Sequence, residues 1–360
     1  MKLAFLARGD SIHTLRWVNA LASRGHNVHL ISSRQEVGEL HPSISFHKLP
    51  HKPPLGYFLN VRVLKRILAE VKPQLLHTHF ASGYGTLGRL SGFHPNILSV
   101  WGSDVYDFPK KSPVHHWLIK TNLEAADWVC STSHVMAEQT KTIYPAPHLS
   151  VTPFGIDMKL FTPCDNQTDL IVLGTVKTLA PKYGIDLLIE AFAKLHEIVD
   201  LQLAQRLRLK IVGGGPQEKE LIELAQTLAV KEQIEFVGQV PHHEVVYWLN
   251  KLDIYVALSR LESESFGVAV LEASACALPV LVSNEGGLPE VVKDGVTGFV
   301  VAKENVAEAA EALTKLVCDA SLRQRMGAAG RAHVLEHYDW EQSVSIMEDV
   351  YRQVLARNEI

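Results

Sequence analysis

Several features that would mark a particular class of protein are scarce or missing in this chain of 360 residues. Its four cysteines are Cys130, Cys164, Cys276 and Cys318, and none of them forms a C-x-x-C pair, so we expect free thiols rather than disulfides. No apolar run approaches the roughly 18 residues that span a bilayer. The first segment, MKLAFLARGD, holds too short an apolar run for a signal peptide. We therefore expect a protein of the cytoplasm.

An excess of positive charge is missing as well. The chain has 35 Lys and Arg against 39 Asp and Glu, a net charge of −4. A protein that holds duplex DNA usually has a strongly basic surface, so nucleic acid is not an expected partner. The hydrophobic content of 47% is enough for globular cores and excludes a disordered chain. At roughly 150 residues per domain, the length predicts about two domains.

What the sequence does contain is an alternation of short apolar runs with helical patterns, and this alternation occurs twice. Uninterrupted apolar strands between helices are typical of a parallel sheet covered on both faces. We predict an α/β protein with two doubly wound, Rossmann-like domains, 1–164 and 165–339, joined in the polar stretch 162–168. Because ligands bind beyond the carboxyl ends of such strands, we expect the site in the loops there, in a cleft between the two sheets.

The densest group of chemically active side chains follows the strand expected at 253–258. The segment ESESFGVAVLE, residues 262–272, contains three carboxylates, and we expect a helix to begin near Ser265 and Phe266. The N–H groups of a first helical turn bind anions such as phosphate. The apolar neighbours of Glu272 predict that it is buried, where its carboxylate needs donors such as the hydroxyls of a sugar. The alternative is that Glu272 lies on a narrow solvated stripe.

The pattern E-S-F-G-V-A-V-L-E resembles the E-x7-E motif of retaining GT-B glycosyltransferases of family 4. Further segments resemble other motifs of that family in the same order, namely VTPFGIDMKLFTP (151–163), GTVKTLAPKYG (174–184), IVGGGP (211–216) and GGLPEVVKDGVTG (286–298). The resemblance implies the GT-B fold and a hexosyltransferase. It also implies that a final helix within 340–360 packs back on the first domain. Its expected donor is a nucleotide sugar, with UDP as the nucleotide and a hexose or N-acetylhexosamine as the sugar. The expected acceptor is sugar or lipid-linked, in polysaccharide or lipopolysaccharide assembly, and the anomeric configuration is retained.

The same resemblance assigns roles in the C-terminal half. Glu264 contacts the donor sugar and Glu272 the ribose. Lys177 and Lys182 neutralise the leaving diphosphate. Backbone contacts to the donor are implied for Ser265, Phe266, Gly267, Val268, Val237 and Gly238. No cofactor is implied, and because the sequence has no D-x-D signature we expect no metal ion.

The assignments in the N-terminal half are less complete. The loop at Gly9 is implied to lie near the diphosphate and the acceptor. The family commonly has a His-Gly pair after its fifth strand, whereas this chain has Trp101-Gly-Ser-Asp104. Since Trp101 cannot accept a proton, Asp104 and His79 are the candidates for that catalytic role.

Other interpretations stay open at this point. Gly83, Gly85 and Gly88 fit the G-x-G-x-x-G fingerprint of NAD-linked oxidoreductases. The segment HVLEH, residues 333–337, fits the H-x-x-E-H motif of a zinc site. A nucleotide-sugar 2-epimerase, or a non-catalytic nucleotide-sugar-binding protein on the same fold, would also share most of these motifs.

A membrane contact is a further possibility. The helix expected at 58–71 carries Arg62, Lys65 and Arg66, and basic and aromatic residues recur between 110 and 120. Such a face could bind anionic lipid at the inner surface of a membrane. A solvated helix face is the alternative.

Overall fold

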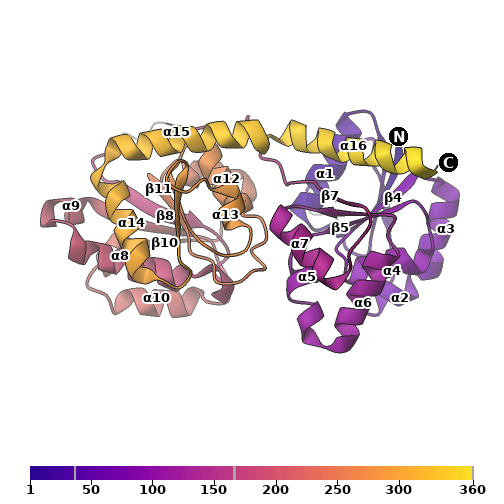
Figure 1. Ribbon diagram of the computed structural model, residues 1–360, viewed down its shortest axis with the longest axis horizontal. Helices are drawn as coiled ribbons and strands as arrows, with labels where there is room; N and C mark the ends of the chain where they lie inside the picture. Colours follow the sequence, from indigo (N-terminus) through magenta and orange to yellow (C-terminus); the bar gives the residue numbers. More distant parts are fainter. Residues whose placement is uncertain (36–37, 165–167, 359–360) are drawn as a thin grey trace. The chain divides into compact units, whose positions relative to one another are not determined.

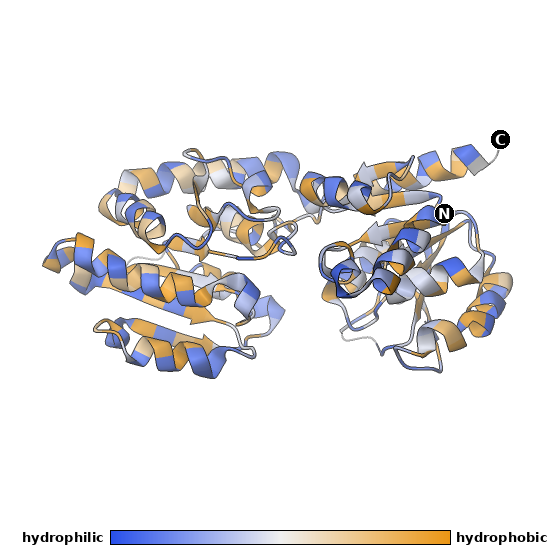
Figure 2. Cartoon of the chain, turned by 60° about the horizontal axis from the view of Figure 1, so that its bottom comes forward, coloured by the Kyte–Doolittle hydropathy of each residue, from blue (hydrophilic) through white to orange (hydrophobic). Residues whose placement is uncertain are grey.

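The computed structural model describes residues 1–35, 38–164 and 168–358, which form two units (Figure 1). Unit 1 consists of Met1–Pro153 together with Glu341–Ile360, and unit 2 consists of Phe154–Trp340. Each unit is built on its own parallel β-sheet. In both, most of the strands are rich in apolar residues, and the helices alternate between apolar and polar faces (Figure 2). The α/β class and the two doubly wound sheets predicted from the sequence are confirmed.

Unit 1 has a seven-stranded sheet in the order β3-β2-β1-β4-β5-β6-β7. Its strands are β1 (Lys2–Leu6), β2 (Asn27–Ser32), β3 (Ser45–Lys48), β4 (Leu75–His79), β5 (Asn96–Val100), β6 (Trp128–Ser131) and β7 (Leu149–Val151). The strand order reverses direction between β1 and β4. Such a topological switch point leaves a crevice at the carboxyl ends of the two strands.

The helices of unit 1 fill the connections between these strands. They are α1 (Ile12–Ser23), α2 (Gly56–Leu59), α3 (Val61–Val71), α4 (Gly83–Ser91), α5 (Ser103–Tyr106), α6 (Pro113–Glu124) and α7 (His134–Ile143). The single helix expected at 58–71 is divided at Asn60. The Asn60 side chain donates to the His51 carbonyl and accepts from the His51 N–H, at 2.8 and 3.1 Å, and so joins the helix pair to the preceding loop.

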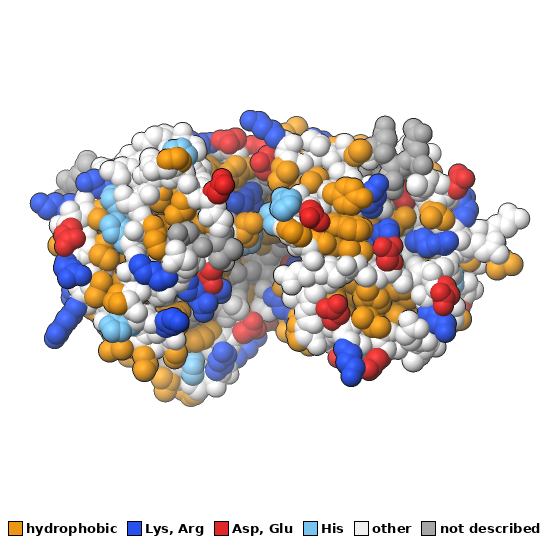
Figure 3. All heavy atoms as spheres, turned by 180° about the vertical axis from the view of Figure 1, so that it is seen from behind, with side chains coloured by type: hydrophobic (Ala, Val, Ile, Leu, Met, Phe, Trp, Pro, Cys, Tyr) orange, Lys and Arg blue, Asp and Glu red, His pale blue; other side chains and the backbone are white. Residues whose placement is uncertain are grey.

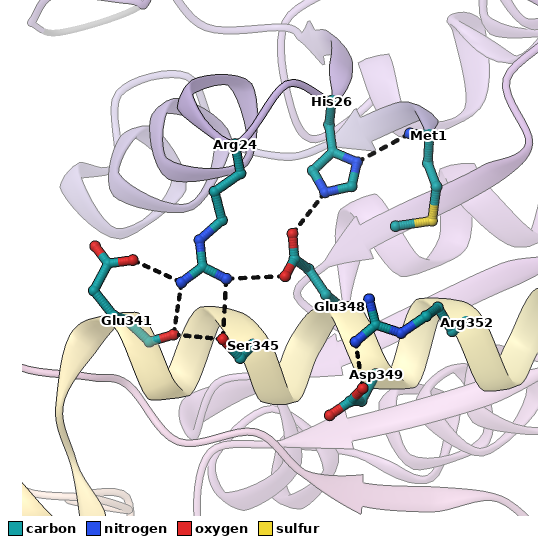
Figure 4. Close-up of polar contacts among 8 residues, drawn as sticks. All are labelled: Met1, Arg24, His26, Glu341, Ser345, Glu348, Asp349 and Arg352. Atoms are coloured by element: carbon teal, nitrogen blue, oxygen red, sulfur yellow. Dashed lines mark hydrogen bonds and ion pairs between the residues drawn. The ribbon is translucent and has the colours of Figure 1, made fainter.

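The last helix, α16 (Trp340–Asn358), completes unit 1. Its buried face has helical spacing and consists of Val344, Met347, Val350, Tyr351 and Val354. Polar contacts hold its start (Figure 4). Arg24, which follows α1, donates to Glu341 and to Glu348 at 2.6 and 2.9 Å. His26 lies between the Glu348 carboxylate and the Met1 amino group, at 2.7 and 3.1 Å.

Unit 2 has a six-stranded sheet in the order β10-β9-β8-β11-β12-β13, with its switch point between β8 and β11. Its strands are β8 (Ile171–Val176), β9 (Leu207–Val212), β10 (Ile234–Gly238), β11 (Ile254–Ala257), β12 (Val280–Ser283) and β13 (Gly298–Val301). Its helices are α8 (Ile185–Ile198), α9 (Leu201–Arg206), α10 (Glu218–Gln226), α11 (Val245–Leu249), α12 (Val268–Ala275), α13 (Leu288–Val291), α14 (Val306–Cys318) and α15 (Ala320–His337).

The division between the units lies earlier than the position 164/165 expected from the sequence. Residues 154–161 already belong to unit 2, because their apolar side chains and backbone are used there. The Phe154 ring packs edge-on against Phe266, and Ile156 donates its N–H to the Tyr338 carbonyl at 2.7 Å. Of the polar stretch 162–168, residues 165–167 lie outside the described residues.

Candidate functional site

The switch point of unit 2 brings together two side chains that lie 87 residues apart in the sequence. Lys177 directly follows β8, and Glu264 lies in the loop after β11. The Lys177 Nζ donates to Glu264 Oε1 at 2.9 Å, and the two side chains are 18% and 8% exposed. This charged pair, formed between neighbouring strands at the carboxyl edge of the sheet, is the centre of the candidate site.

A tyrosine joins the second lysine to this pair. The Nζ atoms of Lys177 and Lys182 lie 4.5 and 4.7 Å from the centre of the Tyr183 ring, within the range of cation–π contact. Tyr183 ends a short 3-10 turn, Pro181–Tyr183, and Gly184 follows with φ 61°, a conformation that favours glycine. The turn therefore holds two positive charges against one aromatic face.

The Lys177 ammonium group is stably charged. Burial by itself would lower its pKa, but the attraction of the Glu264 carboxylate outweighs this and raises the pKa above the ordinary value. The nearby Tyr255 hydroxyl is held neutral, because burial raises its pKa to about 12. Together with Lys182 the pair leaves the site with a net positive charge, and the neutral Tyr255 hydroxyl adds no negative charge at neutral pH.

Close backbone packing fixes the loop that carries Glu264. The Gly287 N–H donates to the Glu264 carbonyl at 2.8 Å. A Cβ on Gly286 would lie 2.3 Å from the Glu264 carbonyl oxygen, and one on Gly287 would lie 2.3 Å from that of Ser265. Only glycine permits this approach, so the loop after β12 clamps the loop after β11.

The helix after this loop begins later than expected. Gly267 is the N-cap of α12, with φ 90°, and Val268 is its first residue. Ser265 and Phe266, expected in the first helical turn, therefore belong to the loop, because the left-handed backbone at Gly267 cannot continue a helix. The backbone of Gly267 and Val268 does lie at the helix N-terminus, where anions are bound favourably.

Glu272 lies in the interior of α12 and is 6% exposed. The alternative of a solvated stripe is therefore wrong. Its carboxylate acts on two buried neighbours, since it contributes to raising the pKa of Tyr255 and, after the effect of burial, that of Cys276. The structure thus places the Glu272 carboxylate inside unit 2, as the apolar pattern around it predicted.

Val237 and Gly238 end β10, on the same carboxyl edge of the sheet. The Gly238 carbonyl accepts the Gly213 N–H at 2.8 Å, and a Cβ on Gly213 would lie 1.9 Å from the Lys177 carbonyl oxygen. A backbone hydrogen bond and a close backbone contact thus connect Val237 and Gly238, the expected base contact, to the loop that carries Lys177.

The candidates in unit 1 surround its own switch point. The N–H of Gly9, in the loop after β1, donates to Ser32 Oγ at 2.9 Å. His79 ends β4, is 2% exposed and packs against Trp101 with ring centres 4.8 Å apart. Its Nδ1 is buried without a hydrogen-bond partner, and burial holds its pKa well below the usual range. His79 is therefore a neutral imidazole.

The Asp104 carboxylate is engaged with backbone donors. It accepts the N–H groups of Ala81, Trp101 and Gly102 at 2.7, 3.0 and 2.9 Å and is 1% exposed. Burial raises its pKa, although these hydrogen bonds oppose the rise. The geometry gives Asp104 a positioning role, joining the loops after β4 and β5.

The two rival motifs do not form the sites that their patterns suggest. Gly83, Gly85 and Gly88 lie inside α4 rather than in a phosphate-binding turn, and they allow close packing of Tyr57 and Thr78. The H-x-x-E-H segment lies on α15. Within residues 1–35, 38–164 and 168–358, no group of three His, Cys, Asp or Glu side chains is arranged to hold a metal ion.

Sequence reasoning missed several side chains at the edge of unit 2. Besides Tyr183, these include the paired Arg260 and Asp186, joined by two hydrogen bonds of 2.7 and 2.6 Å. Another is Glu285, which is 6% exposed and pairs with Lys303 at 2.7 Å. Glu285 directly precedes the Gly286-Gly287 pair, and Tyr183 stands within the K-Y-G motif. The sequence signal that could have identified Tyr183 and Glu285 was their position within or beside these motifs.

Known sequences resemble both halves of the chain. The family described as Glycosyl transferases group 1 matches residues 163–333, and the family described as Glycosyl transferase 4-like matches residues 2–133. A GDP-mannose-dependent alpha-(1-6)-phosphatidylinositol monomannoside mannosyltransferase of Mycolicibacterium smegmatis is 30% identical, over 71% of this chain and 69% of its own. This chain belongs to the family 4 glycosyltransferases.

A second relative spans more of the chain. The N-acetyl-alpha-D-glucosaminyl L-malate synthase of Bacillus anthracis is 26% identical to this glycosyltransferase, over 93% of the present chain and 91% of its own. Solved structures share the GT-B fold. Sucrose-phosphate synthase of Thermosynechococcus elongatus matches with a TM-score of 0.85 at 22% identity, over 99% of this chain and 100% of that one. Anabaena HepE in complex with UDP-glucose matches with a TM-score of 0.78 at 17% identity, over 98% and 100%.

Proposed function

We propose that this glycosyltransferase transfers a hexosyl or N-acetylhexosaminyl group from a UDP-sugar to a hydroxyl of a sugar or lipid-linked acceptor, with retention of configuration. We assign it to polysaccharide or lipopolysaccharide assembly, in the cytoplasm. The observation that carries the proposal is the Lys177–Glu264 pair beside Lys182 at the switch point of unit 2. A sugar diphosphate needs cations for its phosphates and a carboxylate for its hydroxyls, and this edge supplies both.

In the proposed reaction, the bond from the anomeric carbon to the diphosphate oxygen breaks, and its electron pair leaves with the diphosphate. The acceptor oxygen bonds to the same face of the anomeric carbon, and its proton passes to the departing phosphate. Lys177 and Lys182 stabilise the negative charge that develops on the diphosphate, usually the largest catalytic contribution. Because these two cations already face the site, we propose that no metal ion is required.

Glu264 and Glu272 are proposed to bind the donor at two places. Glu264 orients the sugar through its hydroxyls, while its bond to Lys177 holds it in position. Glu272, buried in α12, accepts the ribose hydroxyls. The backbone of Ser265, Phe266, Gly267 and Val268 faces the phosphates and the sugar, and Val237 and Gly238 hold the base.

UDP is proposed as the nucleotide because HepE, which shares the fold, was solved with UDP-glucose. The mannosyltransferase relative is named as GDP-mannose-dependent, so the base is the part of the donor most in need of a direct test. The proposed acceptor residues are those of unit 1. Gly9 lies near the acceptor, His79 stands in place of the histidine that Trp101 replaces, and Asp104 positions the loops around them.

We also propose that unit 1 touches an anionic membrane. The helices α2 and α6 both pack against α4, and they expose Leu55, Phe58, Leu59, Val114 and Trp117 by more than half of each side chain. On the face that Figure 3 draws, lysine and arginine side chains lie scattered among hydrophobic ones over unit 1. An apolar surface with a basic surround binds anionic lipid at the interface. No helix among the described residues is long and apolar enough to cross a bilayer.

The proposed activity is tested by incubating the full chain with UDP- and GDP-sugars and measuring release of the nucleotide diphosphate. Acceptor-dependent release of UDP, with a product that keeps the α configuration of the donor by NMR, is the expected result. Release of GDP alone would contradict the assignment of a UDP-sugar and would indicate a GDP-sugar as the donor. An inverted product would contradict retention, and the absence of any transfer would favour a non-catalytic binding protein.

The membrane contact is tested separately by co-sedimentation with phosphatidylglycerol and phosphatidylcholine vesicles. Binding to the first vesicle type and not to the second is expected, and a Phe58→Ser, Trp117→Ser variant should lose it. Val296→Ser, an equally exposed apolar site of unit 2, is the matched control. Equal sedimentation of all three proteins would contradict the contact.

A further inference from the structure

Unit 1 contains a basic cavity that the proposed donor site does not use. It has a volume of about 510 Å³, within the usual range for small-molecule sites, and it lies beside the carboxyl ends of β1, β2 and β3. Among the described residues that line it are three cations, Arg34, Lys48 and Lys52, and one carboxylate, that of Asp10. The lining is therefore positive overall.

The single carboxylate does not cancel these cations. The Arg8 guanidinium donates to both oxygens of Asp10, at 2.9 and 3.0 Å, and its hydrogen bond is the largest cause that lowers the Asp10 pKa. Arg34 reaches the same carboxylate at 3.2 Å through one nitrogen only. Because the two-point contact with Arg8 already neutralises Asp10, the positive charge of Arg34, Lys48 and Lys52 remains available to a ligand.

The cavity is held by a buried framework. The Ser32 hydroxyl, which is fully buried, accepts the N–H groups of Gly9 and Arg34 at 2.9 and 3.1 Å. The Tyr84 hydroxyl lies 2.9 Å from the Ser33 hydroxyl. The loops after β1 and β2 are thus fixed to one another, so the cavity adjoins the Gly9 loop that the proposed function places near the acceptor.

We propose that this cavity binds a phosphate group carried by the acceptor, held by Arg34, Lys48 and Lys52. A phosphate carries roughly −1.5 to −2 charges at neutral pH, which suits a lining with three cations and a neutralised acid. Arginine and lysine are the usual side-chain donors to phosphate oxygens. The proposal rests on the proposed function only for the statement that the bound molecule is the acceptor.

The binding step is tested on the full chain with inorganic phosphate as the probe, in the presence of saturating UDP. Amide signals of Gly9, Ser33 and Arg34 should shift in a saturable way, and added salt should weaken the binding. Lys48→Gln combined with Lys52→Gln should weaken it about tenfold. Both lysines are exposed, so this variant is expected to fold. The matched control is Lys72→Gln with Lys141→Gln, which removes the same charge from exposed positions of the same unit.

Equal phosphate affinity in the cavity variant and the wild type would overturn the proposal, as would a lack of saturable shifts at these amides. The readout is local to unit 1, so it stands even if UDP fails to bind and the proposed function is wrong. Two further probes identify the source of the phosphate. Displacement by glycerol 3-phosphate but not by glycerol indicates a soluble phosphomonoester, whereas displacement by phosphatidylglycerol but not by phosphatidylcholine vesicles indicates a lipid headgroup.

Discussion

The two units share one sheet topology but fill their switch points with opposite chemistry. Between β8 and β11 of unit 2 lies a charged pair, Lys177 with Glu264, and a second lysine stands on the same tyrosine ring. Between β1 and β4 of unit 1 lie neutral rings, with His79 packed between Phe5 and Trp101. Arg34, Lys48 and Lys52 lie to one side, around the cavity after β2 and β3, and Arg8 after β1 is neutralised by its two-point contact with Asp10.

Under the proposed function, this difference suits the two units to different parts of the transfer reaction. Cations at the centre of an edge suit a group whose charge grows during the reaction, as on a leaving diphosphate. A neutral, aromatic edge suits a sugar face or an uncharged hydroxyl, which loses little by leaving water. The same architecture can therefore serve two substrates, because the loops and not the sheet set the charge.

The largest expected effect comes from removing the central cation of unit 2. Lys177→Met keeps the apolar stem and loses the ammonium group, so kcat should fall about 10²–10³-fold. The measurement is the initial rate of UDP release with saturating donor. The control is Lys210→Met, which breaks the Lys210–Glu235 pair between β9 and β10 and should keep nearly full activity. Similar rates for the two variants would show that a lysine at the switch point contributes no more to transfer than a lysine elsewhere on the sheet.

A second change tests the buried acid of the same unit. Glu272→Ala should lower the affinity for UDP about 10–100-fold in calorimetric titration, because a hydrogen bond to a carboxylate contributes about 1.5–3 kcal/mol to the binding free energy. Glu223→Ala on the exposed face of α10 is the comparison. An unchanged affinity in the Glu272 variant would contradict its contact with the ribose.

The neutral centre of unit 1 predicts acid sensitivity. Burial lowers the pKa of His77 to about 3 and that of His79 well below its usual range. As the pH falls below about 6.5, the unfolded chain takes up these protons and the folded chain does not. The free energy of unfolding should then fall by up to about 1.4 kcal/mol per pH unit for each histidine. Stability is complete above pH 6.5 and is lost toward the lower, folded-state pKa values.

Urea titrations near pH 7 and pH 5 measure this loss. A His79→Phe variant should show a shallower dependence on pH, since it has one buried imidazole fewer. His116→Gln changes an exposed histidine and should leave the slope as it is. If all three proteins lose stability in parallel, the acid sensitivity arises elsewhere.

The smallest expected effect concerns metal ions. If Lys177 and Lys182 supply the charge for the diphosphate, then EDTA should change the transfer rate less than about twofold. The measurement is UDP release before and after chelation. A large loss that magnesium restores would indicate that the two lysines are not sufficient.

The sequence predicted the sheets and much of the donor edge because both leave local signals. The strand expected at 253–258 is β11, Ile254–Ala257, and the final helix expected within 340–360 is α16, Trp340–Asn358. Two features depended on distant contacts and were not predictable. The start of α12 moved to Val268 because Gly286 and Gly287 pack on the preceding loop, and residues 154–161 joined unit 2 through Phe266 and Tyr338.

In the candidate site, E-x7-E and the two lysines could be identified from their motifs, but their geometry could not. Nothing local to Lys177 indicates a bond to Glu264, which comes from the adjacency of β8 and β11. The engagement of Asp104 with three backbone donors is likewise a property of two converging loops. Their roles toward substrates stay predictions.

The return of α16 to unit 1 has a consequence for synthesis on the ribosome. Tyr351 contributes its hydroxyl to His77, at 2.8 Å, and its apolar neighbours cover the same face of the first sheet. The strands of that sheet are therefore translated early, but the part of the face that α16 covers stays exposed until unit 2 has been translated. Premature termination before residue 340 would leave an intact second half tethered to an unfinished first half, a natural substrate for chaperones and proteases.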